Sequence, residues 1–289
     1  MLTFLPLEDT WHDVVGKAMR GFGLTTTQVA LRAGIPLAQL ESVLAADTLS
    51  PKVAPQLAHV LGLDATTLFA LAQYHPSQHD VTILPHGVAV FTTPFADDMT
   101  VNAYVVWDPQ TREAATFDSG TSADALLAFV REQGLTLRFA FITHTHWDHV
   151  LAVREILNAP EAQTAKGFGP GVENPLGLQP IAGSAGFCLG GLTIRTLATP
   201  GHTPGGLSYH IEGLSQPLLV VGDALFAGSM GGVPFSQHEA YRQAHQTIRG
   251  QLLSKSPETL ILPGHGPVTT VARECQHNPF FAGQASVPS

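Results

Sequence analysis

The sequence has few cysteines and no long apolar run near its start. Its two cysteines, Cys188 and Cys275, cannot form a disulfide framework, which is typical of proteins in a reducing compartment. The first nine residues contain neither a basic region nor a long apolar core, so we expect no signal peptide and no membrane span. Together these features favour a cytoplasmic protein.

Positive charge is also scarce. The chain has 14 lysines and arginines against 23 aspartates and glutamates, which gives a formal net charge of -9. This balance argues against a general affinity for nucleic acid or for an anionic membrane. Charged residues make up 13% of the 289 residues and hydrophobic ones 44%, so the chain can bury a substantial core. The length fits one large domain, or a large and a small one.

Potential metal ligands crowd one short stretch, residues 143–149, which reads Thr-His-Thr-His-Trp-Asp-His. A β-branched and aromatic run precedes it and helix-forming residues follow, which predicts a turn between a strand and a helix. In extended chain His144 and His146 point the same way, whereas Asp148 and His149 project to different sides. Such a loop can offer ligands to two cations at once. Zinc, iron and manganese accept imidazole nitrogen and carboxylate oxygen.

Three later loops carry further ligands, each just after an expected strand. His202 lies in the turn Thr-Pro-Gly-His-Thr-Pro-Gly, Asp223 ends the run Val-Val-Gly-Asp, and His265 lies in Leu-Pro-Gly-His-Gly. Strands fix the backbone while loops aim the side chains, so distant parts of a sequence can form one site. We therefore expect these residues to complete the site that begins at 143–149.

The first quarter of the chain reads as all helix. Apolar residues recur at helical spacing over residues 11–75, and Thr25, Pro36 and Asp64 are placed to begin helices. From residue 78 the composition changes to strands and turns. We therefore expect a helical domain over residues 1–77 and a second domain over residues 78–289.

Residues 23–41 resemble the helix-turn-helix of the Cro and phage-repressor family. The segment equivalent to the recognition helix, residues 36–48, has no lysine or arginine, and residues 1–75 contain four basic residues against six acidic ones. Since DNA binding needs cations against the phosphates, we do not expect nucleic acid as a partner. The alternatives are a dimerisation module, which leaves a homodimer open, or a wall on one side of the active site.

The second domain contains many strands and a few helices. Strands are expected within 81–95 (two short ones), 101–118 (a hairpin), 137–142, 192–197, 207–211, 218–221 and 260–262, and helices over 122–132, from the 143–149 cluster to 157, and over 237–253. The Gly/Pro-rich passage 159–191 shows little periodicity and is expected to be a surface excursion near the site. This pattern suits two packed sheets flanked by helices, an αββα sandwich of the α+β class.

The ligand motifs resemble those of the metallo-β-lactamase superfamily, and within it the glyoxalase II-like (hydroxyacylglutathione hydrolase-like) hydrolases. They are His-x-His-x-Asp-His at 144–149, Thr-Pro-Gly-His-Thr at 199–203, Gly-Asp at 222–223 and Pro-Gly-His-Gly at 263–266, in that order. The resemblance covers roughly residues 80–289. It implies one metal held by His144, His146 and His202 and a second by Asp148, His149 and His265, with Asp223 bridging them.

The resemblance also implies a mechanism and a small-molecule substrate. A hydroxide shared by two divalent metal ions would attack the carbonyl of a thioester or ester, and one metal would hold the developing oxyanion. Zinc is the metal we expect first, with iron and manganese as alternatives. Asp148 would orient the water and accept its proton. A glutathione thioester is the leading substrate, although residues 226–234 lack the Gly-Arg-x-Asp segment of those relatives.

Other functions stay open. A persulfide dioxygenase-like oxidoreductase would use a single iron on His144, His202 and Asp223. A lactonase or β-lactamase would use the two-metal site on another carbonyl, and a DNA-binding regulator would use the metal domain as a sensor. The two cysteines and the nine histidines outside the motifs are expected to be ordinary surface or core residues.

Overall fold

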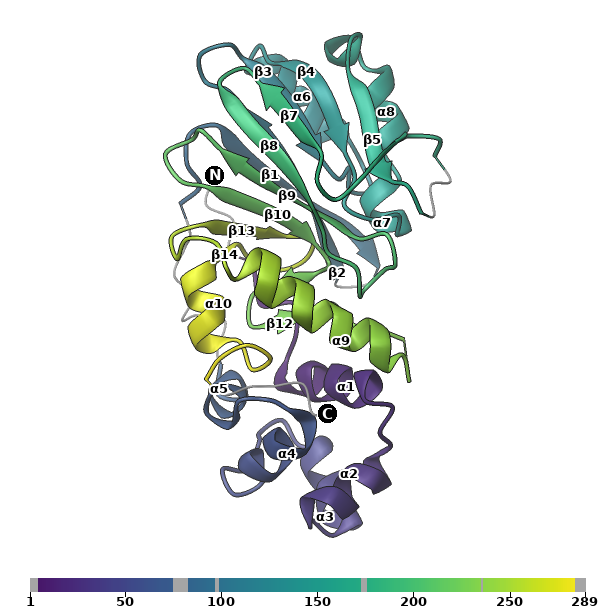
Figure 1. Cartoon of the computed structure of the whole chain (residues 1–289), viewed down its shortest axis with the longest axis vertical. Coiled ribbons are helices and arrows are strands. Elements are labelled where there is room, and N and C mark those ends of the chain that lie inside the picture. Colours follow the sequence, from purple (N-terminus) through teal and green to yellow (C-terminus); the bar gives the residue numbers. More distant parts are fainter. Residues whose placement is uncertain (1–4, 75–82, 97–98, 173–175, 235, 284–289) are drawn as a thin grey trace.

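The computed structural model describes residues 5–74, 83–96, 99–172, 176–234 and 236–283. Within these ranges two six-stranded β-sheets pack face to face, with helices on their outer sides (Figure 1). A group of short helices from the start of the chain lies at one end of the long axis, beyond α9 and α10. The predicted αββα sandwich preceded by a helical region is confirmed.

The first sheet combines antiparallel and parallel strands. In order across the sheet, its strands are β1 (Val88–Ala96), β2 (Met99–Trp107), β3 (Glu113–Phe117), β4 (Thr136–Phe141), β5 (Lys166–Pro170) and β6 (Gln179–Ile181). Strands β1 to β3 are antiparallel neighbours, whereas β3 to β6 run parallel to one another. The ends of β3 and β4 therefore lie at the same edge of the sheet.

The second sheet faces the first. In order, its strands are β14 (Thr269–Thr270), β13 (Leu260–Pro263), β10 (Leu218–Gly222), β9 (Leu207–Glu212), β8 (Leu192–Ala198) and β7 (Gly186–Leu189). Strand β10 is parallel to β13 and antiparallel to β9, which is itself antiparallel to β8. Strands β8, β10 and β13 therefore all run in the same direction. A small hairpin, β11 (Leu225–Phe226) and β12 (Ser229–Met230), follows β10.

Strand β10 shows why a central strand reads as an unbroken apolar run. Successive side chains of a strand point to opposite faces of the sheet. Leu218 and Val220 lie in the cluster between the two sheets, whereas Leu219 and Val221 lie in the cluster on the outer side. Each such burial stabilises the fold by about 1.5–3 kcal/mol, so a polar residue is unfavourable on either face.

Helices cover the outer face of the first sheet. They are α6 (Asp124–Glu132), α7 (Trp147–Val150), α8 (Val153–Asn158) and a 3-10 turn (Pro160–Ala162). Leu126 and Val130 of α6 pack in one cluster with Val105 of β2. The helix predicted to end at 157 is divided into α7 and α8, because residues 151 and 152 form a turn between them.

Residues 5–74 contain five helices, and three of them begin at the positions predicted from the sequence. The five helices are α1 (Trp11–Gly21), α2 (Thr26–Ala33), α3 (Leu37–Leu44), α4 (Ala54–Leu61) and α5 (Ala65–Leu71). The Thr25 side chain accepts a hydrogen bond from the Gln28 amide at the start of α2, and Asp64 accepts one from the Thr67 amide at the start of α5. These are ordinary N-caps, which satisfy amides that the helix itself leaves unpaired.

The helical region packs tightly on the sandwich. Helix α9 (His238–Thr247), which continues into a π-helical turn (Ile248–Leu252), and α10 (Val271–His277) cover the outer face of the second sheet. One hydrophobic cluster contains Val14 of α1, Leu57 of α4, Tyr241 of α9 and Phe280 beyond α10. The N-terminal helices and the sandwich therefore share one core.

Two expectations for the second domain are wrong. The passage 159–191 contains β5, β6 and β7 instead of a surface excursion, because these short strands, of which β5 and β7 contain glycine, are specified by pairing with other strands and show no alternation. Within 83–95 a single strand begins at Val88, and residues 81–82 lie outside the described ranges. Cys188 and Cys275, expected to be ordinary surface or core residues, are both exposed.

The helix-turn-helix likeness and the division at residue 77 stay predictions. The described ranges omit residues 75–82, where the division is expected to fall. None of the helices in the described residues is long and apolar enough to cross a membrane.

Candidate metal centre

Strand ends from both sheets meet at one edge of the sandwich. The loop after β4 and the helix α7 that follows it carry residues 143–149, and the loops after β8, β10 and β13 carry His202, Asp223 and His265. Because β8, β10 and β13 run in the same direction, their C-terminal ends lie together. The structure brings all seven residues singled out in the sequence into two neighbouring groups.

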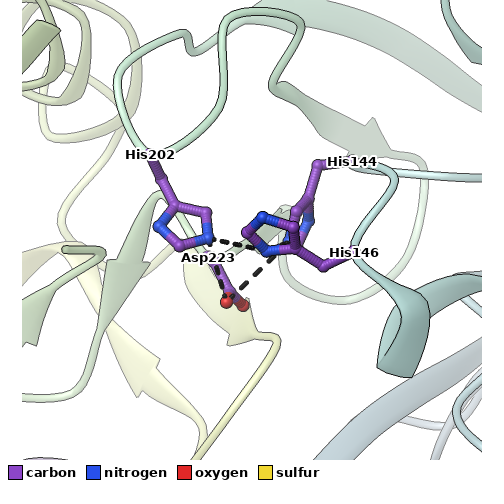
Figure 2. A group of neighbouring side chains, drawn as sticks. All are labelled: His144, His146, His202 and Asp223. Atoms are coloured by element: carbon purple, nitrogen blue, oxygen red, sulfur yellow. Dashed lines mark hydrogen bonds and ion pairs between the residues drawn. The ribbon is translucent and has the colours of Figure 1, made fainter. Parts of the chain in front are cut away.

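The first group consists of His144, His146, His202 and Asp223, with ligand atoms within 4.8 Å of one another. Their ring nitrogens and carboxylate face a common point (Figure 2). The Nδ1 atom of His146 lies 3.0 Å from Nε2 of His144 and 3.1 Å from Nε2 of His202. The Oδ2 atom of Asp223 lies 3.9 Å from Nε2 of His144 and 3.5 Å from Nε2 of His202. Such convergence of one carboxylate and three imidazoles is suited to a cation.

The second group consists of Asp148, His149 and His265, again with ligand atoms within 4.8 Å of one another. The Oδ2 atom of Asp148 lies 3.6 Å from Nε2 of His149 and 3.4 Å from Nε2 of His265. Asp223 reaches this group as well: its Oδ1 lies 3.3 Å from His149 and its Oδ2 lies 3.4 Å from His265. The Asp223 carboxylate therefore lies between the two groups.

Asp118 supports both groups and was not identified from the sequence. Its Oδ2 lies 2.8 Å from Nδ1 of His149 and accepts a 2.8 Å hydrogen bond from the Thr143 hydroxyl, while its Oδ1 accepts one from the Thr143 amide at 2.7 Å. The Thr143 hydroxyl lies 3.1 Å from Nδ1 of His144. A carboxylate that orients imidazole ligands is a common partner in metal sites. The sequence feature that could have identified Asp118 is its position just after β3, because β3 runs parallel to β4 and the two strands end at the same edge of the sheet.

Backbone carbonyls fix the orientation of two more imidazoles. The Nδ1 of His202 donates to the carbonyl of Gly232 at 2.7 Å, and the Nδ1 of His265 donates to the carbonyl of Thr100 at 2.6 Å. A carbonyl can only accept, so the proton sits on Nδ1 in the neutral ring and Nε2 keeps its lone pair. Both Nε2 atoms face Asp223.

Gly264 is required by the close approach of β13 to the site. A Cβ atom at this position would lie 2.3 Å from Oδ1 of Asp223 and 2.6 Å from Cε1 of His149. Both distances are far below van der Waals contact, and the neighbouring atoms belong to buried groups. The Pro-Gly-His-Gly motif therefore needs this glycine in order to place His265.

Burial keeps two of the imidazoles neutral. It lowers the pKa of His144 well below the usual histidine value, and the neighbouring His149 lowers it further. Burial also lowers the pKa of His202, against the opposing effect of the Asp223 carboxylate. Neutral imidazole is the form that binds metals, so these two side chains are ready to act as ligands.

In the second group, the pKa values of both histidines are raised. Burial would lower the pKa of His149, but the carboxylates of Asp223 and Asp118 raise it to about 10. Burial opposes protonation of His265 too, but hydrogen bonding with Asp148 and Asp223 raises its pKa to about 11. Burial also disfavours the charged form of Asp223, but His149 keeps the pKa of that carboxyl well below its usual value. A cation that binds here replaces protons as the partner of the carboxylates.

The donor set fits divalent metals. Among the described residues, Nε2 of His149 and Oδ1 of Asp223 are buried without a hydrogen-bond partner, although they face one another. Buried polar atoms without partners are costly, and a coordinated cation would satisfy both. Five imidazoles and two carboxylates are ligands for zinc, iron or manganese and are too rich in nitrogen for calcium or magnesium.

The remaining described histidines do not join the site. His245 is buried against Tyr241 and Phe281 in the core shared with the helical region. His277 lies at the end of α10. His75 and His79 lie outside the described residues.

Comparison with known proteins places this site in a family. The profile described as "Metallo-beta-lactamase superfamily" matches residues 96–167 and 180–265, which together make up more than half of the chain. Both matched ranges contain ligand candidates, and between them they include all seven. The five N-terminal helices lie outside the match.

Individual proteins are similar to the second part of the chain in sequence or in structure. The probable metallo-hydrolase YqgX of Bacillus subtilis is 30% identical over 190 residues, covering 58% of this chain and 86% of YqgX. The hydroxyacylglutathione hydrolase GloC of Haemophilus influenzae is 30% identical over 199 residues, covering 62% of this chain and 92% of GloC. The crystal structure of ETHE1 from Myxococcus xanthus superposes with a TM-score of 0.58 at 30% identity, covering 68% of this chain and 85% of ETHE1.

Proposed function

The chain belongs to the metallo-beta-lactamase superfamily, and we propose that its site is a binuclear metal centre that hydrolyses a thioester or ester. The observation that carries this proposal is the position of the Asp223 carboxylate, whose oxygens lie 3.3–3.5 Å from His149, His202 and His265. One carboxylate within reach of two imidazole groups is suited to bridge two cations.

Each group would hold one cation, as expected from the sequence. His144, His146 and His202 would hold one, Asp148, His149 and His265 the other, and Asp223 would bridge them. Bound divalent metals would supply Lewis-acid activation of a water molecule and of the substrate carbonyl. We propose zinc first, with iron and manganese as alternatives that the same ligands accept.

Asp148 is placed to handle the proton of the attacking water. Its carboxylate is buried, and its Oδ2 lies 3.4 Å from Nε2 of His265. In the reaction, the water oxygen bonds to the carbonyl carbon, the bond from that carbon to sulfur or oxygen breaks, and an acid and a thiol or alcohol leave. Asp148 would take the proton from the water and return it to the leaving group.

An apolar surface beside the site suggests what the acyl group is like. Trp147 and Leu151 are 53% and 59% exposed, and they are four residues apart at the start of α7 and just beyond its end. The Phe95 ring lies 5.7 Å from the ring of Trp147 and 5.3 Å from that of His265. Exposed large apolar side chains that gather beside a reactive centre are typical of a binding surface. We therefore propose that the substrate carries an apolar acyl substituent.

A second candidate is an oxidoreductase of the persulfide dioxygenase type with a single iron. His144, His202 and Asp223 form a set of two histidines and one carboxylate, which non-haem iron enzymes use. The presence of Asp148, His149 and His265 beside this set favours two metals over one. The hydrolase is therefore preferred.

Metal analysis and two assays test this proposal. Protein purified without chelator is expected to contain two equivalents of zinc and to release free thiol from S-lactoylglutathione or from simpler acyl thioesters, with lactones and β-lactams as further substrates. One equivalent of iron together with oxygen uptake on glutathione persulfide would favour the oxidoreductase instead.

The acyl preference has its own test. Thioesters of one thiol with acetyl, butyryl and hexanoyl groups are expected to show a KM that falls with acyl length. Leu151→Ala should reduce this dependence, whereas Leu31→Ala, at an exposed position on α2, should not. A KM independent of acyl length would contradict the apolar surface as a substrate contact.

A further inference from the structure

The segment from β11 to Gly232 lies directly against the ligand side chains. The carbonyl of Gly232 accepts the hydrogen bond from Nδ1 of His202. Gly231 lies so close to Asp223 that a Cβ atom would fall 1.8 Å from the Asp223 carbonyl oxygen. The Phe226 ring meets the ring of His265 edge-on, with centroids 5.7 Å apart. The position of this segment therefore affects ligands from both metal groups.

Lys17 of α1 contacts the same segment. Its ammonium donates a 2.9 Å hydrogen bond to the carbonyl of Met230 and lies 4.7 Å from the centre of the Phe226 ring. Its aliphatic carbons lie 3.7 Å from the position that a Cβ of Gly232 would take. One side chain therefore contacts the segment at three points.

Lys17 is a buried charge, which is uncommon in a protein core. The residue is 9% exposed, and its ammonium is paired with the buried carboxylate of Asp9. A buried ion pair is often no more stabilising than apolar side chains of the same volume. The pair does, however, fix the ammonium in one place, from which it can hold the Met230 carbonyl.

A second contact links the start of the chain to the site. The backbone amide nitrogen of Glu8 lies 3.0 Å from the position that a Cβ of Gly266 would take, one residue after His265. Glu8 and Lys17 therefore lie against the loop after β13 and against residues 226–232, respectively. Both Glu8 and Lys17 lie outside the part of the chain that matches the family profile.

We propose that Lys17 is a positioning residue of the metal centre, which acts on His202 and His265 through residues 226–232. This role rests on the proposed metal-dependent function. The N-terminal helical region is then part of the catalytic unit, because its first helix, α1, supplies the lysine that holds residues 226–232 next to the ligands.

The test compares metal binding by wild type and by Lys17→Met, which keeps the length of the side chain and removes its charge and hydrogen bond. Competition with a chromophoric chelator is expected to show zinc affinity weakened about tenfold, as for other partners of metal ligands. The visible spectrum of the cobalt-substituted protein should also change, because it reports ligand geometry. Lys52→Met, at an exposed position of the same region, should match wild type in both measurements.

Lys17→Arg covers the case in which Lys17→Met does not fold. Arginine keeps the charge and the pairing with Asp9, but its planar guanidinium would move the charge away from the Met230 carbonyl. The same loss of affinity and change in spectrum are expected, at an unchanged melting temperature of the metal-free protein. Wild-type affinity and spectrum in either folded variant would overturn the proposal. Failure of wild type itself to bind metal would instead refute the proposed metal centre.

Discussion

Replacing His245 with leucine is expected to make the fold less sensitive to acid. His245 is 2% exposed and packs against the rings of Tyr241, Phe280 and Phe281. Among the described residues, neither of its ring nitrogens has a hydrogen-bond partner. Burial, together with the nearby Arg249, lowers its pKa from 6.5 to about 3.

The sign and size of the effect follow from linkage between protonation and folding. Between pH 6.5 and pH 3 the unfolded chain binds a proton on His245 and the folded chain does not, so the free energy of unfolding decreases as the pH falls. One pKa unit corresponds to about 1.4 kcal/mol, so this residue alone accounts for a loss of about 2 kcal/mol between pH 7 and pH 5. Leucine has no proton to bind and should remove that loss.

The assay is urea unfolding of metal-free protein at pH 7 and pH 5. Chelator treatment is needed because metal affinity itself depends on pH through the ligands. His245→Leu should lose about 2 kcal/mol less than wild type on acidification. At pH 7 it should be no less stable than wild type, because leucine fills the site without burying unpaired nitrogens.

A matched exchange, His59→Leu, controls for the loss of a histidine. His59 lies on α4 with its side chain exposed to solvent, so its replacement should keep the wild-type difference between the two pH values. If His245→Leu lost as much stability on acidification as wild type, the reasoning from burial would be refuted.

Three further outcomes follow from the site. Asp223→Ala should abolish hydrolysis and lower the metal content measured by elemental analysis, and normal turnover in this variant would rule out a bridging role. Asp118→Asn should weaken metal affinity by about 10- to 100-fold in chelator competition, because His149 loses its orienting carboxylate, and an unchanged affinity would argue against that support. Gly264→Ala should lower both metal content and melting temperature, since its Cβ would lie 2.3 Å from Asp223, and a variant that keeps both would show that the loop can shift.

The ligand motifs could be recognised from the sequence because each is local. His144, His146, Asp148 and His149 share one loop, and their spacing along the chain already limits which side chains can face one metal. The apolar runs that precede the motifs identified the strands that carry them, since β10 and its neighbours are buried on both faces. The layered sandwich followed from the number of such strands.

The strands between 159 and 191 could not be predicted in this way. Strand β5 is defined by parallel pairing with β4, and β7 by pairing with β8 across a turn. Their glycines carry no side chain that could reveal a pattern of alternation. Hydrogen bonds to a partner strand, and not local propensity, decide such elements.

By itself, the sequence determined which side chains could bind metal and which strands they follow. Both could be recognised because the spacing of ligands and the apolar content of strands are properties of short stretches of sequence. Only the tertiary structure decided what lies behind those ligands. Asp118 reaches His149 across 31 positions, and Lys17 reaches Met230 across 213. Contacts over such separations depend on how sheets and helices pack, and no local pattern of residues encodes them.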